Sequence, residues 1–217
     1  MLEPTSEREL LSRAHGLAGR TIDELSLTHA RTSRAGHKGF VGSLVERALG
    51  LVQRGAGPDL PSLGIELKTI PIATDGRPRE STFVCMVPRD GLDHGWSESA
   101  PRSKLARVLF VPVERDGQRR VGMAFLWSPS EGDEATLASD WTELAGLLRT
   151  HGHEHVSAHH GQLMQVRPKA RSAASRWRAT GDDDAPMLAL PRAFYLRRRF
   201  VASILSRTGM AGPRVET

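Results

Sequence analysis

The sequence predicts an α/β fold in which a mixed sheet is flanked by helices. Apolar residues recur at helical spacing behind capping boxes in the first 50 residues. From residue 65 onward, short apolar runs alternate with turns rich in Gly, Pro and Asp, which is typical of strands. A chain of 217 residues can bury a real core. We expect one domain with two lobes at residues 1–207, and a flexible tail at 208–217.

Three helices are expected before the first strand. Ser6-x-x-Glu9 and Thr21-x-x-Glu24 are capping boxes and predict two short helices. The segment FVGSLVERALG then predicts a third helix, because its aliphatic residues form one stripe at helical spacing. Glu46 lies off that stripe, so the core does not require it.

The stretch DLPSLGIELKTIP, residues 59–71, predicts the first strand. Its alternation has the period of a half-buried strand, with Ile65 and Leu67 entering the core. Glu66 and Lys68 then share the opposite face, about 6.6 Å apart along the strand. Taken alone, this pattern favours a solvated face with a paired acid and base.

The later segments complete the sheet. STFVCMV is nearly continuous in apolar residues and predicts a central strand. ARVLFVPV and VGMAFLW predict two strands joined through Asp116-Gly117. Residues 134–149 have an amphipathic helical pattern, and HEHVSAHHGQLMQVRPK is typical of a hairpin with Gly161 near its tip. PRAFYLRRRFVASILSR predicts a last helix opened by Pro191.

Composition narrows the function. The net charge of +5 and the pI of about 10.1 favour a polyanionic partner. No apolar run approaches the ~18 residues of a membrane span, and the start, MLEPTSEREL, lacks the apolar core expected of a signal peptide. The single cysteine, Cys85, lies in an apolar run and is expected to be a buried thiol, which fits a reducing cytoplasm. Of 30 basic residues only four are lysines, each beside a segment with other functional features: Lys38, Lys68, Lys104 and Lys169.

Asp59 and Glu66 converge if the chain turns between them. Two carboxylates with free space between them are hard oxygen ligands suited to Mg²⁺. Lys68, next outward on the same face, could orient the attacking water or neutralise charge on a phosphate in hydrolysis.

Pro58-Asp59, six residues and Glu66-Leu67-Lys68 together resemble the PD-(D/E)xK signature of restriction-endonuclease-like nucleases. Longer segments are more specific: KGFVGSLVERALG, LGIELKTIPI, GRPRESTFVC, LARVLFVPVE, FLWSP, RPKA and LPRAFYL occur in this order. Together they resemble the MutH family of DNA mismatch-repair endonucleases over about residues 5–207. The resemblance implies a restriction-endonuclease-like fold with two lobes around a DNA cleft.

The resemblance also implies roles for residues of the site. Asp59, Glu66 and Lys68 fall on the positions that bind metal and assist the attacking water. Glu46 matches a further acid on the preceding helix, and Lys38-Gly39 matches a DNA-contacting position near the site. The implied reaction is Mg²⁺-dependent nicking of double-stranded DNA at GATC, 5′ to the guanine of the unmethylated strand. MutL, recruited by MutS, is the implied activator of an enzyme expected to be monomeric.

Base recognition is expected elsewhere in the chain. Arg167 and Lys169 match the recognition loop of the family, and Arg or Lys bidentate to guanine is the commonest specific contact in the major groove. Tyr195 and Phe83 match positions linked to sensing the adenine methyl group. Core packing is the alternative for Phe83, and packing beside a buried helix face is the alternative for Tyr195. Phosphate contacts, which position the protein on DNA without reading its sequence, are expected from Lys104 and from residues 197–199.

Two other functions stay open. A GATC-specific type II restriction endonuclease would use the same chemistry without a mismatch. A DNA-binding module without catalysis is disfavoured, because three carboxylates facing phosphates would weaken binding. The histidines between His151 and His160 have no helical spacing and no cysteine beside them, so a solvated hairpin is preferred over a zinc site.

Overall fold

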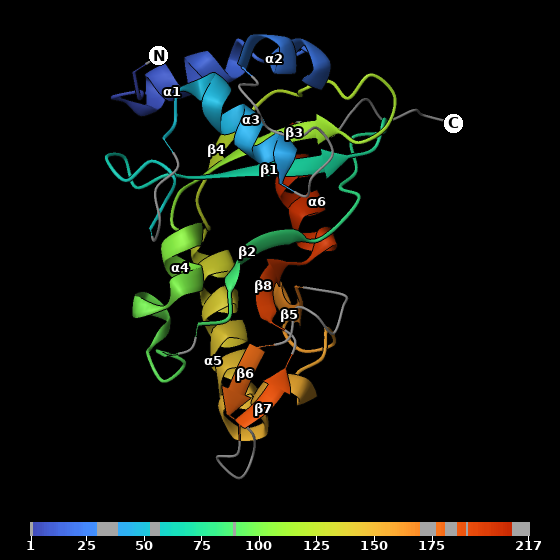
Figure 1. The fold of residues 1–217 in the computed structure, drawn as a ribbon. Coiled ribbons are helices and arrows are strands. Elements are labelled where there is room, and N and C mark those ends of the chain that lie inside the picture. Colours follow the sequence, from blue (N-terminus) through green and yellow to red (C-terminus); the bar gives the residue numbers. More distant parts are fainter. Residues whose placement is uncertain are drawn as a thin grey trace. The chain divides into compact units, whose positions relative to one another are not determined.

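The computed structural model describes residues 2–29, 39–52, 57–88, 90–169, 177–180, 186–189 and 191–209. The chain forms two compact units, which Figure 1 shows as ribbons. Unit 1 comprises Met1–Glu80, Ala106–Ser128 and Ala202–Thr217, and unit 2 comprises Ser81–Leu105 and Pro129–Val201. No helix of the described ranges is long and apolar enough to cross a membrane.

Unit 1 combines three helices with a mixed sheet. The helices are α1 (Glu7–His15), α2 (Ile22–His29) and α3 (Phe40–Leu49). The strands are β1 (Glu66–Ile72), β3 (Val108–Glu114) and β4 (Phe125–Trp127), in the order β1-β3-β4. β1 and β3 are parallel, while β3 and β4 are antiparallel, as the predicted turn between them requires. The helices lie over this sheet in Figure 1, and aliphatic side chains from both form the core.

Local sequence explains the helix starts. Thr21 Oγ1 accepts a hydrogen bond from the Glu24 amide at 3.1 Å, and the Glu24 carboxylate accepts one from the Thr21 amide at 2.9 Å. This is the predicted capping box. At α1, Ser6 Oγ accepts from the Glu9 amide at 3.2 Å, but the Glu9 carboxylate accepts from the Thr5 amide instead.

Unit 2 is built on a second, antiparallel sheet. Its strands are β2 (Thr82–Met86), β8 (Arg192–Leu196) and β5 (Met164–Pro168), in the order β2-β8-β5. The helical elements are η1 (Trp96–Glu98), α4 (Ala100–Leu105) and α5 (Glu131–His155), and β6 (Trp177–Thr180) pairs with β7 (Pro186–Ala189). α6 (Arg198–Arg207) follows β8, and its residues from Ala202 onward belong to unit 1. The rings of Trp141 on α5 and Phe194 on β8 pack 5.5 Å apart, centroid to centroid.

Four sequence predictions about these elements are wrong. β2 lies at an edge of its sheet, because β8 is the one strand among the described residues that pairs with it, and Cys85 on β2 is half-buried. The segment expected as one helix after Pro191 is a strand followed by a helix. The expected hairpin around Gly161 is the end of α5 followed by β5, which pairs with β8. For the last two segments, pairing with a distant strand outweighs the local pattern.

Candidate active site

A short turn brings Asp59 to the start of β1. Leu60 and Ile65 form an antiparallel bridge, with their backbone hydrogen bonds at 2.8 and 3.1 Å. Gly64 closes the turn at φ +66°, a conformation that side chains disfavour. Asp59 Oδ2 then accepts a hydrogen bond from the Leu67 amide at 2.9 Å. The Asp59 carboxylate therefore lies at the peptide that joins Glu66 to Leu67.

Glu66 and Lys68 form a buried ion pair on β1. Lys68 Nζ lies 3.1 Å from Glu66 Oε1, and their side chains are only 5% and 7% exposed for Lys68 and Glu66, respectively. The prediction of a solvated strand face, which the alternating pattern favoured, is therefore wrong. Leu67 packs in the core from the other face, so β1 is buried on both sides at this point. Burial of a charge is costly unless it is paired, which ties the two side chains to each other.

The third predicted acid comes from the helix before the motif. Glu46 lies on α3 and is half-buried. Among the residues that the structure describes, no three His, Cys, Asp or Glu side chains are grouped closely enough to hold a metal ion. The structure thus brings Asp59 to the strand that carries Glu66 and Lys68, and the role of Glu46 as a further acid stays a prediction. Two carboxylates of the hard oxygen type that Mg²⁺ prefers remain beside one ammonium.

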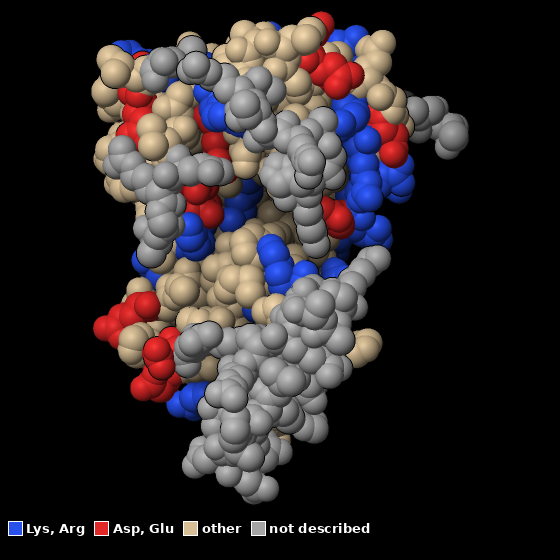
Figure 2. Space-filling model, viewed as in Figure 1, with Lys and Arg blue, Asp and Glu red and all other residues tan. Residues whose placement is uncertain are grey.

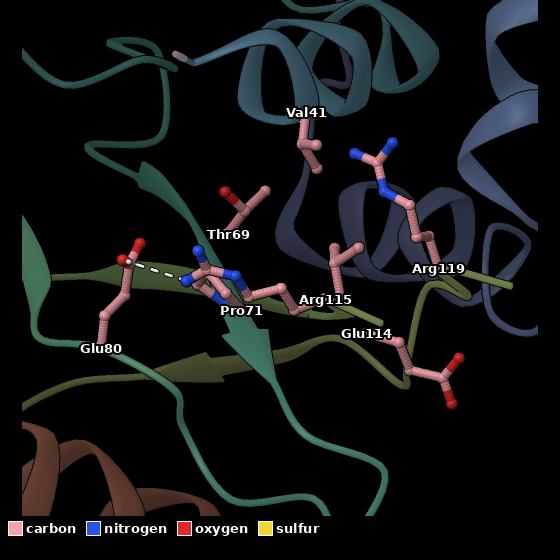
Figure 3. Close-up of a pocket in the computed structure, with 8 residues that line it drawn as sticks. Val41, Thr69, Pro71, Glu80, Glu114, Arg115 and Arg119 are labelled. Atoms are coloured by element: carbon pink, nitrogen blue, oxygen red, sulfur yellow. Dashed lines mark ion pairs between the residues drawn. The ribbon is translucent and has the colours of Figure 1, made fainter. Parts of the chain in front are cut away.

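A pocket of about 310 Å³ opens in unit 1 beyond the acidic residues (Figure 3). Its lining includes Thr69 and Pro71, which follow Lys68 on β1. Arg115 extends across it toward Glu80, at 3.6 Å. Glu66 and Lys68 do not line this pocket, so the acidic site and the pocket are distinct features. No local sequence pattern predicts this pocket, because its walls come from α3, β1, β3, the β3–β4 turn and Glu80.

Four of the predicted DNA-binding residues meet on one face of the sheet in unit 2. The rings of Phe83 and Tyr195 lie edge to face, with centroids 5.7 Å apart and planes at 75°. The Arg167 guanidinium lies 5.8 Å from the Tyr195 ring centroid, and Lys169 Nζ lies 3.3 Å from that of Phe83. The β-sheet register explains this, because Phe83 and Tyr195 are paired residues on β2 and β8. We call these four side chains the aromatic-basic cluster.

The remaining predicted DNA contacts are spread over both units. Gly39 is the N-cap of α3 and has φ +95°, which favours glycine at this position. Lys38 lies outside the described residues. Lys104 is half-buried on α4. On the face seen in Figure 2, Lys and Arg side chains gather in clusters with Asp and Glu side chains among them.

Arg197 has a structural role that the sequence did not reveal. Its guanidinium donates to the carbonyls of Ala158, His160 and Gly161 at 2.8, 2.7 and 3.0 Å. Burial lowers the pKa of Arg197, and the neighbouring Arg199 cation lowers it further. Nε and Nη2 of Arg197 thus hold the turn before β5, and its phosphate contact stays a prediction.

Asp140 holds the same turn from the other side and was also missed. This residue of α5 is 1% exposed, and its carboxylate accepts hydrogen bonds from the amides of Gln162, Leu163 and Met164 at 2.6, 2.7 and 2.7 Å. Charge-assisted bonds of this kind are short and strong. They fix where β5 begins, and so where Arg167 stands. Only the tertiary fold brings Asp140 to residues more than 20 positions away.

The fold and the motif together define a class of protein. A mixed α/β fold with Pro-Asp before a strand and Glu-x-Lys on it is a restriction-endonuclease-like enzyme, a DNA endonuclease. Residues 53–140 match the family model described as DNA mismatch repair enzyme MutH.

Curated relatives cover nearly the whole chain. The DNA mismatch repair protein MutH of Pectobacterium atrosepticum is 42% identical over 95% of this chain and 94% of the relative. The protein of the same name from Vibrio parahaemolyticus is 42% identical, over 94% of each. That of Salmonella typhi is 43% identical, over 94% of this chain and 93% of the relative. The chain therefore belongs to the MutH family.

Proposed function

We propose that this protein nicks the unmethylated strand of hemimethylated GATC sites, 5′ to the guanine, in methyl-directed mismatch repair. Its relatives carry the name of a DNA mismatch repair protein, which supports the pathway. In this proposal residues 1–207 act as one nuclease domain with two lobes, as a cytoplasmic monomer. MutL, brought to the mismatch by MutS, activates it.

The chemistry of the two carboxylates fits Mg²⁺ as the cofactor. Mg²⁺ keeps several waters and binds proteins through one or two carboxylates together with substrate phosphate. Asp59 and Glu66 supply two carboxylates, and we propose Glu46 as the further acid of the site. When bound, Mg²⁺ polarises the phosphate and makes water more acidic.

Lys68 has a defined task in this proposal. Its ion pair with Glu66 holds the ammonium beside the acidic site at 3.1 Å. A compact ammonium can approach a single phosphate oxygen, where it neutralises the charge that develops during hydrolysis. The buried pair therefore orients the cation before DNA arrives, so that less reorganisation is needed when the bond breaks.

The aromatic-basic cluster is proposed to recognise the GATC sequence and its methyl mark. Arg167 and Lys169 meet guanine edges, and the Phe83–Tyr195 ring pair distinguishes adenine from N6-methyladenine. The methyl group adds bulk and removes one amino hydrogen, so a closely packed phenol can discriminate. Lys38 and Gly39 contact DNA near the site, and Lys104 contacts a phosphate of the DNA backbone.

The observation that supports the proposal most is the Asp59–Leu67 hydrogen bond, which joins the two halves of the nuclease motif. The test uses purified protein with Mg²⁺ and three plasmids that carry GATC in unmethylated, hemimethylated and fully methylated form. We expect nicking of the first two and little of the third. A plasmid without GATC is the control. Equal nicking of all four plasmids would exclude the proposed specificity, and double-strand cleavage of the unmethylated plasmid alone would favour the restriction enzyme.

A further inference from the structure

Gln165 lies among the residues of the aromatic-basic cluster but is buried, unlike Arg167 on the same strand. It is 6% exposed, whereas Arg167 is exposed. In the sheet register Gln165 stands directly opposite Tyr195, which in turn stands opposite Phe83. Paired residues of neighbouring strands have Cβ atoms about 4.5–5.5 Å apart and point to the same face. Gln165, Tyr195 and Phe83 therefore form one row across three strands.

The side chain of Gln165 crosses the central strand. Its Nε2 donates a hydrogen bond of 2.8 Å to the hydroxyl of Ser81, the residue just before β2. Gln165 belongs to β5, so this bond links the two outer strands of the sheet, which are separated by two spacings of about 4.8 Å each. It passes over β8 beside Tyr195. Phe194, on the opposite face of β8, packs into the core against Trp141. This packing holds β8, and with it Tyr195, in place.

This bond fixes the strands that carry the aromatic-basic cluster. Backbone pairing already joins each outer strand to β8, but a sheet can still twist about its central strand. The Gln165–Ser81 bond adds a direct connection between β5 and the residue just before β2, two positions from Phe83. A buried amide donor without an acceptor costs free energy, so the folded protein favours conformations that keep this hydrogen bond.

We propose that Gln165 is a positioning residue for recognition of the methyl mark. Its amide, bonded to Ser81, holds the Phe83–Tyr195 ring pair at the geometry that separates adenine from N6-methyladenine. This inference rests on the proposed function. The proposed role of Gln165 concerns the choice between the two DNA strands and leaves the cleavage chemistry at Asp59 unchanged.

The test measures strand selection within a single substrate. Both strands of a hemimethylated GATC duplex are end-labelled, and the nicking rates of the unmethylated and the methylated strand are compared for each protein. This ratio does not depend on how much of a variant is folded, because unfolded protein lowers both rates equally. Ser81→Ala and Gln165→Leu should each lower the ratio by about 2- to 10-fold, the factor typical of one hydrogen bond.

Three further variants separate positioning from a general loss of structure. Ser81→Thr keeps the hydroxyl and should keep the wild-type ratio. Ser81→Ala combined with Gln165→Leu should lower the ratio no further than either change alone, because both remove the same bond. Thr142→Ala, which removes the hydroxyl bond to the Ala138 carbonyl in α5, should leave the ratio unchanged.

Wild-type ratios in both single variants, or effects that multiply in the double variant, would overturn the inference. A wild-type protein that cuts both strands equally would instead overturn the proposed function.

Discussion

The buried pair of Glu66 and Lys68 leads to a prediction about stability. Lys68→Met removes the ammonium that lies 3.1 Å from Glu66 Oε1 and leaves the carboxylate in a site where it is only 7% exposed. Removing one partner of a buried pair costs about 3–5 kcal/mol. For a chain of this size each kcal/mol corresponds to roughly 2–4 °C in melting temperature, so we expect a decrease of about 6–20 °C.

A double variant tests whether the pair itself causes this loss. Lys68→Met combined with Glu66→Gln removes both charges, and a buried pair replaced as a whole is often neutral for stability. We expect the double variant to lie within about 1 kcal/mol of wild type, so that adding Glu66→Gln recovers about 2–4 kcal/mol of the stability lost in Lys68→Met. The assay is urea unfolding of the four proteins at neutral pH with a chelator present. A Lys68→Met protein as stable as wild type, or additive effects in the double variant, would refute the physical reasoning.

Addition of metal extends the same experiment. Mg²⁺ at about 100 times its dissociation constant should stabilise by about 2.7 kcal/mol any variant that keeps Asp59 and Glu66. Stabilisation should disappear in the double variant, in which Glu66 is lost. Equal stabilisation of the double variant would place the metal elsewhere.

Four further outcomes are expected. Asp59→Ala should abolish nicking in Mg²⁺ while DNA binding measured by gel shift persists, and full activity would mean that the site is wrongly placed. Lys68→Arg should lose most activity, whereas Arg198→Lys should change only the affinity and its salt dependence slightly; similar behaviour of both would contradict the special role of lysine. Arg167→Ala should weaken the preference for GATC by about 1–3 kcal/mol without changing metal binding, and an unaltered preference would count against base contact. Asp140→Asn should cost about 2–4 kcal/mol in unfolding free energy followed by tryptophan fluorescence, because an amide cannot accept all three backbone bonds; no loss would contradict its anchoring role.

Structural features that depend on neighbouring residues in the chain could be predicted from the sequence. The capping box of α2, the N-cap Ser6 of α1, the apolar stripe of α3 and the turn between β3 and β4 each depend on residues close together in the chain, and the structure contains them. The motif that joins Asp59 to the Glu66–Lys68 strand was also recognisable, because its spacing fits a short turn before a strand.

Features that depend on distant partners could not be predicted. Burial of Glu66 and Lys68 requires neighbours from other elements, and alternation alone cannot distinguish a solvated face from a covered one. The segment around Tyr195 contains a proline and a helical pattern, yet it forms a strand because β2 and β5 pair with it on both sides. Asp140 and Gln165 have no local signature, since their partners lie 22–24 and 84 residues away.

The proposed reaction is tested most directly by mapping the cut on a hemimethylated GATC duplex with each strand labelled in turn, in Mg²⁺, with wild-type protein and Glu66→Ala. We expect the wild-type protein to produce one product, from a nick 5′ to the guanine of the unmethylated strand, and Glu66→Ala to produce none. Cuts in both strands, a cut at another position, or the same product from Glu66→Ala would contradict the proposed function.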